Sequence, residues 1–259
     1  MLKSEFIIKW IQKEFGEMDN KIIIGISGGK DSTICAGLLV KALGKDRVIG
    51  VLMPNGEQTD INDSHRVIEH LGIESRVINI SHGYDGLMYA IANSQENVED
   101  AYNAYENDMI KTNLPSRLRM ATLYAVAALY PGSRVVNTSN WSERYIGYST
   151  KYGDGVGDFS LLCEFTVREV LQIGDEIGLP YDLVHKVPSD GMSGKSDEER
   201  IGFTYDELDD YLLNVTLPTF ELLNKIEKLH AKNLHKIVNM KCPSRKEYEE
   251  VYNETKNHI

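Results

Sequence analysis

The sequence predicts an α/β fold in which a doubly wound parallel sheet of about five strands carries helices on both faces. Short β-branched runs alternate with helical stretches, which is the pattern of βαβ units. The runs are also nearly continuous in apolar residues, as expected for strands covered by helices on both sides. No composition break interrupts the 259 residues. We therefore expect a single domain over residues 1–259.

Each element is predicted from its own local pattern. Strands are expected in four apolar runs, at residues 22–26, 47–53, 76–80 and 134–138. Helices are expected at residues 2–16, 31–43, 60–71, most of 86–130, and from 205 onward. Pro115 should break the fourth of these helices, and residues 240–243 should interrupt the last. Residues 147–157 and 188–202 are rich in glycine and are expected to be functional loops.

Composition excludes several classes of protein. Hydrophobic residues make up 42% and charged residues 26% of the chain, so a sizeable core is expected. A net charge of −11 argues against nucleic acid as the main partner, because binding phosphate backbones needs clustered Lys and Arg. Cys35, Cys163 and Cys242 lie far apart, so neither a disulfide framework nor a zinc site is indicated. We find no signal peptide or membrane-spanning run and expect a cytoplasmic protein without a membrane partner.

A glycine-rich segment between the first strand and the next helix gives the sharpest functional signal. It runs Gly25, Ile26, Ser27, Gly28, Gly29, Lys30, Asp31, Ser32, Thr33. The glycines allow a tight turn whose amides point at an anion, and the start of the helix adds its positive dipole end. The serines supply hydroxyl donors, and Asp31 can hold magnesium against phosphates. The alternative is an ordinary glycine turn in which Asp31 caps the helix.

The SGGxDS sequence within this segment resembles the loop of the PP-loop ATP pyrophosphatases. It lacks the spacing of a Walker loop and of GxGxxG. The resemblance implies a Rossmann-like, adenine nucleotide alpha-hydrolase-like sheet and cleavage of ATP between its α and β phosphates. Several ligases and tRNA-modifying enzymes share this loop, so the loop alone indicates the class and not the member.

Further motifs resemble those of the ammonia-dependent NAD synthetases. They occur in family order from Gly25 to Lys236, as N-L-P-S-R-L-R-M at 113–120, N-T-S-N-W-S-E at 137–143, T-K-Y-G-D-G at 150–155, P-S-D-G at 188–191, G-F-T-Y-D at 202–206 and His-Lys at 235–236. The resemblance implies a carbon–nitrogen ligase that converts deamido-NAD and ammonia into NAD, with ATP as co-substrate and Mg²⁺ as cofactor. It also implies a homodimer with the deamido-NAD site at the subunit interface. No glutaminase segment is recognised.

The resemblance assigns roles residue by residue. Residues 25–32, Thr138 and Ser189 would bind ATP. Asp31 and Glu143 would be the magnesium ligands. Deamido-NAD would be bound by Arg117, Lys151, Asp158, His235 and Lys236. Lys186 would neutralise phosphate charge, and Asp158 is also our candidate for accepting a proton from ammonium. Residues 189–202 are the expected lid, with glycine hinges.

Two positions depart from the family pattern. Lys30 stands where many members have Gln, and Val167 stands where some members have an ATP-contacting Lys. Arg168 is an alternative source of that contact.

Several of these residues also have a simpler structural explanation. Arg117 and His235 are compatible with a surface position, and Glu143 with a helix cap. Two other functions are also weighed. One is a tRNA-modifying PP-loop enzyme, disfavoured by the negative charge and by the isolated cysteines. The other is a non-catalytic nucleotide-binding protein, which we expect would have lost a metal ligand such as Asp31 or Glu143.

Overall fold

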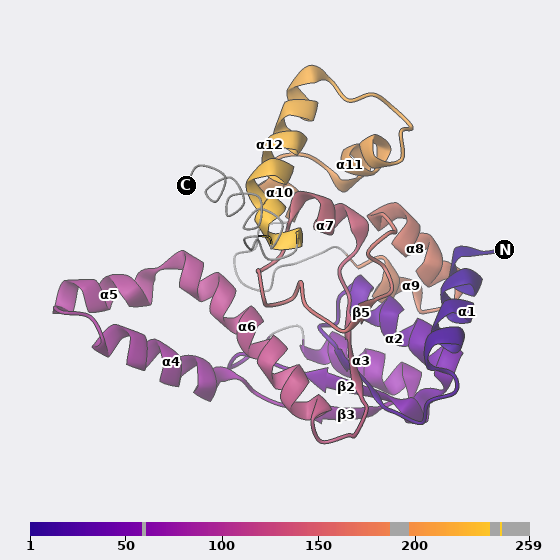
Figure 1. The fold of residues 1–259 in the computed structure, drawn as a ribbon, viewed down its shortest axis with the longest axis horizontal. Helices are drawn as coiled ribbons and strands as arrows, with labels where there is room; N and C mark the ends of the chain where they lie inside the picture. The colour runs from indigo at the N-terminus through magenta and orange to yellow at the C-terminus, as the bar shows by residue number, and fades with distance from the viewer. Residues whose placement is uncertain (59–60, 187–196, 239–243, 245–259) are drawn as a thin grey trace, which may run out of the picture.

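The sheet at the centre of the molecule is parallel and has five strands in the order β3-β2-β1-β4-β5 (Figure 1). The strands are β1 (Ile22–Gly25), β2 (Val48–Leu52), β3 (Glu74–Val77), β4 (Arg134–Asn137) and β5 (Phe159–Ser160). The computed structural model describes residues 1–58, 61–186, 197–238 and 244. The chain order reverses between β1 and β4, and ligands of such sheets bind at this switch point, beyond the carboxyl ends of the strands.

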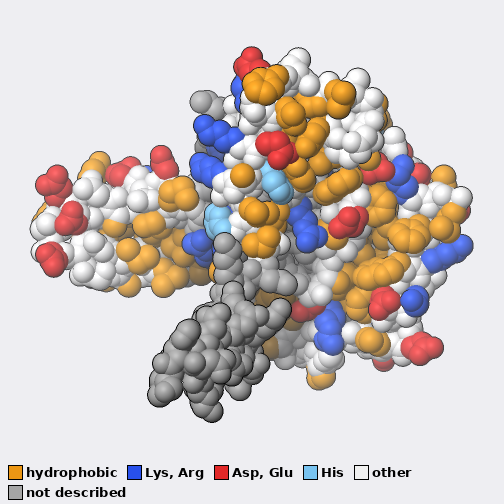
Figure 2. Space-filling view, turned by 45° about the horizontal axis from the view of Figure 1, so that its top comes forward, with side chains coloured by type: hydrophobic (Ala, Val, Ile, Leu, Met, Phe, Trp, Pro, Cys, Tyr) orange, Lys and Arg blue, Asp and Glu red, His pale blue; other side chains and the backbone are white. Residues whose placement is uncertain are grey.

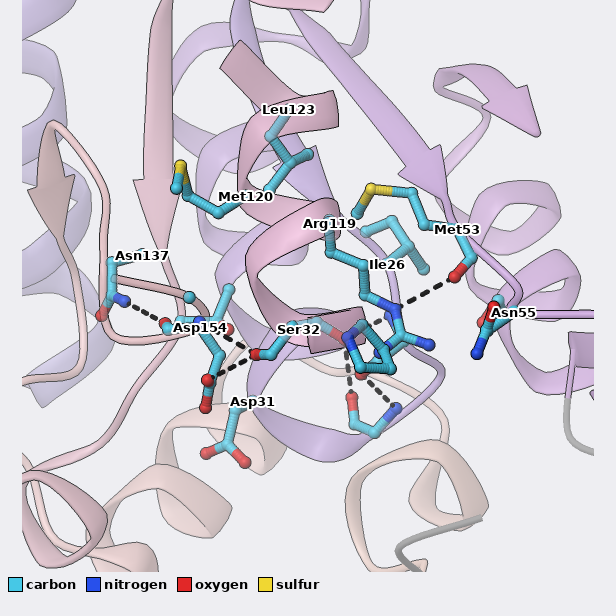
Figure 3. Close-up of a pocket in the computed structure, with 18 of the residues that line it drawn as sticks. Ile26, Asp31, Ser32, Met53, Asn55, Arg119, Met120, Leu123, Asn137 and Asp154 are labelled. Atoms are coloured by element: carbon cyan, nitrogen blue, oxygen red, sulfur yellow. Dashed lines mark hydrogen bonds between the residues drawn. The ribbon is translucent and has the colours of Figure 1, made fainter. Parts of the chain in front are cut away.

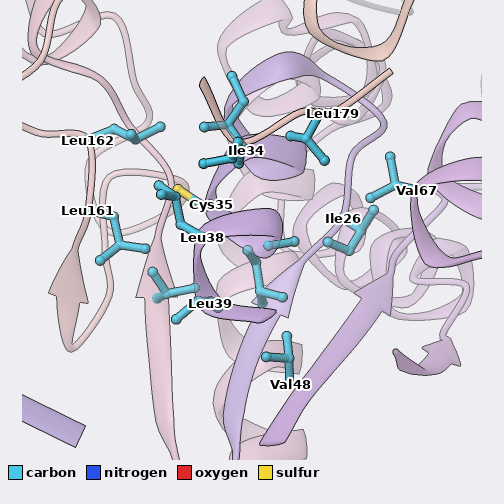
Figure 4. Close-up of a cluster of buried hydrophobic side chains, with 14 of the residues drawn as sticks. Ile26, Ile34, Cys35, Leu38, Leu39, Val48, Val67, Leu161, Leu162 and Leu179 are labelled. Carbon is cyan, nitrogen blue, oxygen red and sulfur yellow. The ribbon is translucent and has the colours of Figure 1, made fainter. Parts of the chain in front are cut away.

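The strand residues alternate between two apolar cores, one on each face. Ile22 and Ile24 of β1 belong to a larger cluster, whereas Ile23 packs with Ile49 and Val51 of β2 on the opposite face. Figure 4 shows the larger core around Cys35, which is fully buried. Burial on both faces explains the continuous apolar runs of β1 and β2.

Helices cover both faces, as predicted. The larger core is covered by α1 (Lys3–Phe15), α2 (Lys30–Leu43), α3 (Ile61–Leu71), α8 (Val167–Glu176) and α9 (Tyr181–Val184). The one-turn η1 (Lys45–Arg47) follows α2 and contacts it. The opposite face is covered by α6 (Asp108–Ala127), whose Leu118 and Leu123 pack on the smaller core. Together with the five parallel strands, this arrangement confirms the predicted fold class.

An arm of helices projects from the body of the molecule. It consists of α4 (Ser81–Asn93), α5 (Val98–Glu106) and the first part of α6 (Figure 1). The predicted break at Pro115 is wrong, because α6 continues through this residue. Proline removes one amide donor, but Pro115 is buried and the following turns pack on the sheet, so the helix is held by tertiary contacts.

A third apolar cluster lies beyond the sheet. It is formed by α7 (Trp141–Ile146), α11 (Tyr205–Leu212) and α12 (Phe220–Ile237). The C-terminal helical region is interrupted at residues 213–219, and the predicted break at 240–243 lies outside the described residues. Residues 197–201 form α10 (Asp197–Ile201), so the predicted loop at 188–202 is wrong for its last part. No helix of the described residues is long and apolar enough to cross a membrane.

Candidate active site

The glycine-rich loop joins β1 to α2, and hydrogen bonds made by its own serines fix its conformation. Gly28 has φ +78°, and a Cβ added to it would lie 2.9 Å from the Ser64 amide nitrogen, so only glycine fits. The Ser27 and Ser32 hydroxyl oxygens lie 3.1 Å apart, and Ser32 Oγ donates to the Gly29 carbonyl at 3.1 Å. Gly29 is the N-cap of α2 and has no side chain to cover the first amides of the helix. This geometry suits an anion.

Two carboxylates lie beside this loop, and one asparagine joins the side chain of the first to the backbone of the second. Asp31 lies in the first turn of α2 and Glu143 in the first turn of α7. Asn140 is fully buried at the N-cap of α7, where its Oδ1 accepts from the Glu143 amide at 2.9 Å. Its Nδ2 donates to Asp31 Oδ1 at 3.1 Å. The N-cap of α7 is therefore Asn140 and not Glu143, so the Glu143 carboxylate takes no part in capping the helix.

The two carboxylates and the Lys30 ammonium influence one another's charge. Burial and the neighbouring charge of Asp31 raise the pKa of Glu143 to about 8, although the Lys30 ammonium opposes this shift. Burial disfavours the charged form of Lys30, but Asp31 and Glu143 outweigh burial and raise the pKa of this lysine. Lys30 Nζ lies 2.8 Å from Asp31 Oδ2. Additional positive charge next to Glu143 would therefore favour its ionised form.

Magnesium fits this donor set. It prefers oxygen ligands and is commonly held by one or two protein carboxylates together with substrate phosphates. Asp31 and Glu143 offer two such carboxylates beside an anion-binding loop. Within the described part of the chain, no group of three or more His, Cys, Asp or Glu is placed to hold a metal without a substrate. We therefore expect the phosphates of a nucleotide to complete the coordination.

These groups open into one cavity of about 610 Å³, shown in Figure 3. Of the expected site residues, the wall contains Gly25, Ile26, Ser27, Gly29, Lys30, Asp31, Ser32, Thr138, Glu143 and Lys186. The apolar part of the wall includes Met53 from the end of β2 and Met120 and Leu123 from α6. A cavity that combines an apolar wall with a phosphate-type loop suits a nucleotide.

Lys186 reaches the cavity from the segment after α9. Its ammonium donates to the carboxylate of Asp63 on α3, and this hydrogen bond lowers the pKa of Asp63. Asp63 also pairs with Arg66 at 3.3 Å. Ser189 and most of the expected lid lie outside the described residues. Asp197 of α10, which belongs to a segment that resembles the family but was given no role from the sequence, lines the cavity and accepts from the Tyr148 hydroxyl at 2.9 Å.

The expected dinucleotide-binding residues lie outside the cavity wall, as far as the structure describes it. Three of them meet at the loop at 147–157: Lys151 belongs to it, and Arg117 and Lys236 donate to its carbonyls. Arg117 Nε donates to the Lys151 carbonyl at 3.2 Å, and Lys236 Nζ donates to the Gly147 carbonyl at 2.9 Å. We call Arg117, Lys151 and Lys236 the basic group. His235 is the exposed neighbour of Lys236 on α12.

Asp154 connects the basic group to the cavity, and the sequence analysis missed this role. It lines the cavity, accepts from Ser116 Oγ on α6 at 2.6 Å, and accepts from the Thr150 amide at 2.9 Å. These bonds fix the loop at 147–157 against α6. The motif T-K-Y-G-D-G contains Asp154, but only the folded chain shows which partners the aspartate binds.

Two other predicted residues are engaged elsewhere. Asp158 accepts from the Val135 amide at 2.7 Å and from the Tyr124 hydroxyl at 3.2 Å, so it fastens the start of β4. Arg168 forms ion pairs with Asp210 at 2.8 Å and with Asp206 at 3.3 Å, both on α11. The structure therefore does not bring Arg168 into the cavity as a replacement for the lysine that is absent at Val167.

The fold and this site define an α/β protein that binds a nucleotide at the switch point of a parallel sheet. Comparisons with known proteins give the family. The model of the NAD synthase family matches residues 3–249. The NH(3)-dependent NAD(+) synthetase of Alkaliphilus metalliredigens is 33% identical over 94% of this chain and 98% of its own length. That of Pyrococcus horikoshii is 37% identical, covering 84% of this chain and 86% of its own.

Solved structures agree with this assignment. The NMN synthetase of Francisella tularensis superposes with a TM-score of 0.81 at 31% identity, covering 93% of this chain and 97% of its own. The NH3-dependent NAD synthetase of Campylobacter jejuni superposes with a TM-score of 0.69 at 25% identity, covering 93% and 98%. The chain belongs to the NAD synthase family, whose members are nucleotide-binding ligases of NAD biosynthesis.

Proposed function

We propose that this protein uses ATP to amidate deamido-NAD with ammonia, giving NAD, AMP and pyrophosphate through an acyl adenylate. The observation that carries this proposal is the Asp31–Asn140–Glu143 arrangement facing an anion-binding loop in one cavity. Membership of the NAD synthase family and relatives named NH(3)-dependent NAD(+) synthetase support it.

The first half-reaction activates the carboxylate, which does not react with ammonia because its oxygen is a poor leaving group. A nicotinate oxygen attacks the α-phosphorus of ATP, the bond from this phosphorus to the bridging oxygen breaks, and pyrophosphate leaves. The amides at residues 27–32 hold the triphosphate, and the Lys186 ammonium moves from Asp63 to the departing charge. Magnesium on Asp31 and Glu143 would supply further neutralisation of phosphate charge.

In the second half-reaction ammonia attacks the activated carbonyl and AMP leaves. The apolar wall formed by Met53, Met120 and Leu123 helps to keep water from the adenylate. The lid at 189–202 stays a prediction, and it would also keep water from the adenylate. Asp158 as the acceptor of the ammonium proton also stays a prediction. Each oxygen of its carboxylate accepts one hydrogen bond and keeps a further lone pair for a proton.

The basic group gives deamido-NAD a place to bind next to the cavity. Arg117, Lys151 and Lys236 offer three positive charges to the phosphates of a dinucleotide. Burial lowers the pKa of Lys236, whereas the charge of Asp154 opposes this shift. The nicotinate end would then reach past Asp154 to the α-phosphate of ATP.

A second candidate substrate is the corresponding mononucleotide. The chain superposes on the NMN synthetase of Francisella tularensis with a higher TM-score, 0.81, than on the NAD synthetase of Campylobacter jejuni, 0.69. The test is to measure kcat/KM with deamido-NAD and with nicotinate mononucleotide under saturating ATP and ammonium. We expect deamido-NAD to be preferred at least about tenfold. A preference for the mononucleotide would reassign the substrate but not the chemistry.

We also propose a homodimer formed through the projecting arm. Large apolar side chains are exposed along α4, α5 and the start of α6 (Figure 2), at Leu87, Tyr89, Val98, Tyr102, Tyr105 and Met109. An exposed apolar surface of this kind marks an interface. Sedimentation of wild type should give a dimer, and Tyr102→Glu should give a monomer. Tyr181→Glu is the matched control, because Tyr181 of α9 is also exposed but lies outside the arm. A monomeric wild type would contradict the proposal.

A further inference from the structure

Lys30 places a buried ammonium next to the acidic pair. It is the first residue of α2, and its side chain is only 10% exposed. Its Nζ donates to Asp31 Oδ2 at 2.8 Å, and its charge also acts on Glu143. A lysine is unfavourable both at a helix N-terminus, where the dipole is positive, and in a buried position. The two carboxylates compensate for both costs.

The hydrogen bonds of Asp31 decide which group a metal must displace. Asp31 Oδ1 accepts from Asn140, and Oδ2 accepts from Lys30. Asn140 is fully buried and caps α7, so its amide is fixed. Lys30 has a flexible four-carbon side chain that ends in the cavity. A cation that approaches Asp31 therefore replaces the Lys30 ammonium at Oδ2 and leaves Asn140 in place.

We propose that the Lys30 ammonium is a built-in counter-ion of the Asp31–Glu143 site, which it neutralises in the metal-free protein and leaves when magnesium enters. The inference rests on the metal site of the proposed function. It makes free magnesium a weak ligand, because the metal must expel a cation first. It also makes the metal and ATP bind together, since the triphosphate gives the released ammonium a new partner. Metal then enters efficiently only when the nucleotide is present.

The test is metal binding to the nucleotide-free protein, with Mn²⁺ as the probe and electron paramagnetic resonance as the readout. Lys30→Gln removes the competing charge and should tighten Mn²⁺ binding by at least about tenfold. Lys30→Arg keeps the charge and should stay within about threefold of wild type. Lys41→Gln is the matched control, because Lys41 is exposed near the other end of α2. Mn²⁺ binding that is no tighter in Lys30→Gln than in wild type would overturn the proposal.

Thermal unfolding gives a second readout that does not depend on activity. In EDTA, Lys30→Gln should melt below wild type, because the Asp31 carboxylate loses the ammonium that pairs with its Oδ2 at 2.8 Å. Added Mg²⁺ should raise its midpoint at concentrations that leave wild type unchanged. Equal midpoints of variant and wild type in EDTA would contradict the counter-ion role.

Two further measurements separate this inference from the proposed function. Adding Asp31→Ala to Lys30→Gln should abolish the tighter Mn²⁺ binding, and persistence of that binding would place the metal elsewhere and overturn the inference. NAD formation by wild type is measured independently. A wild type that forms no NAD refutes the proposed function even if Lys30→Gln binds Mn²⁺ tightly. NAD formation with unchanged Mn²⁺ binding refutes the counter-ion alone.

Discussion

Replacing Glu143 by glutamine should change how the stability of the metal-free protein depends on pH. Burial and the charge of Asp31 raise the pKa of Glu143 from the usual 4.5 to about 8 in the folded protein. Between these values the folded protein keeps a proton that the unfolded chain has released. Stability therefore falls as the pH rises through this window and is lowest once Glu143 is ionised in both states. Glu143→Gln has no such proton and should not show this loss.

The size of the change in folding stability follows from the shift in the pKa of Glu143. Each pH unit within the window costs about 1.4 kcal/mol, so the two units from pH 6 to pH 8 cost about 3 kcal/mol. For a chain of this length, this corresponds to roughly 6–12 °C in the melting midpoint. The advantage of Glu143→Gln over wild type should therefore grow by about that amount between pH 6 and pH 9.

The assay is thermal unfolding followed by circular dichroism in EDTA at pH 6, 7, 8 and 9. Glu164→Gln, at an exposed position, controls for the loss of a surface charge. Adding Mg²⁺ with ATP should reverse the order of stability, since the ionised Glu143 then has a metal partner. A difference between Glu143→Gln and wild type that stays constant from pH 6 to pH 9 would show that Glu143 does not keep a proton in the folded protein.

Four other substitutions test individual side chains. Arg168→Ala should leave the KM for ATP unchanged, because this arginine pairs with α11, and a large rise in KM would return Arg168 to the nucleotide site. Asp154→Ala frees the loop at 147–157 and should lower kcat/KM for deamido-NAD about tenfold more than kcat/KM for ATP; equal losses would contradict its linking role. Ser64 Oγ is buried without a hydrogen-bond partner among the described residues, so Ser64→Ala should not lower the melting midpoint. Ser142→Ala, which loses a bond to the buried Asp209, should lower it by several degrees, and equal midpoints for the two serine variants would refute this comparison.

The parts of the fold that depend on local pattern could be predicted from the sequence. The runs around β1 and β2 are continuous in apolar residues because both faces are buried, and they were placed within a residue or two. β5 has only two residues and is held by pairing with β4, so no periodicity could predict its position. Pro115 misled the prediction because burial in α6 outweighs the lost amide bond.

The candidate site also has a part that could be predicted from local sequence and a part that could not. The loop from Gly25 to Ser32 is contiguous, so its role could be predicted from its residue types. Asn140 joins Asp31 to α7 across 109 positions of sequence, and only the assembled sheet brings these groups together. The pairing of Arg168 with α11 likewise depends on tertiary packing, which is why the sequence left its role open.

Adenylation of the substrate carboxylate at this site can be followed by the transfer of oxygen from the substrate to AMP. Deamido-NAD labelled with ¹⁸O in the nicotinate carboxylate is incubated with the protein, ATP, Mg²⁺ and ammonium, and the products are analysed by mass spectrometry. We predict one labelled oxygen in each AMP, unlabelled pyrophosphate, and no transfer with Asp31→Ala. Label in phosphate or pyrophosphate, or NAD formed with unlabelled AMP, would contradict adenylation at this site.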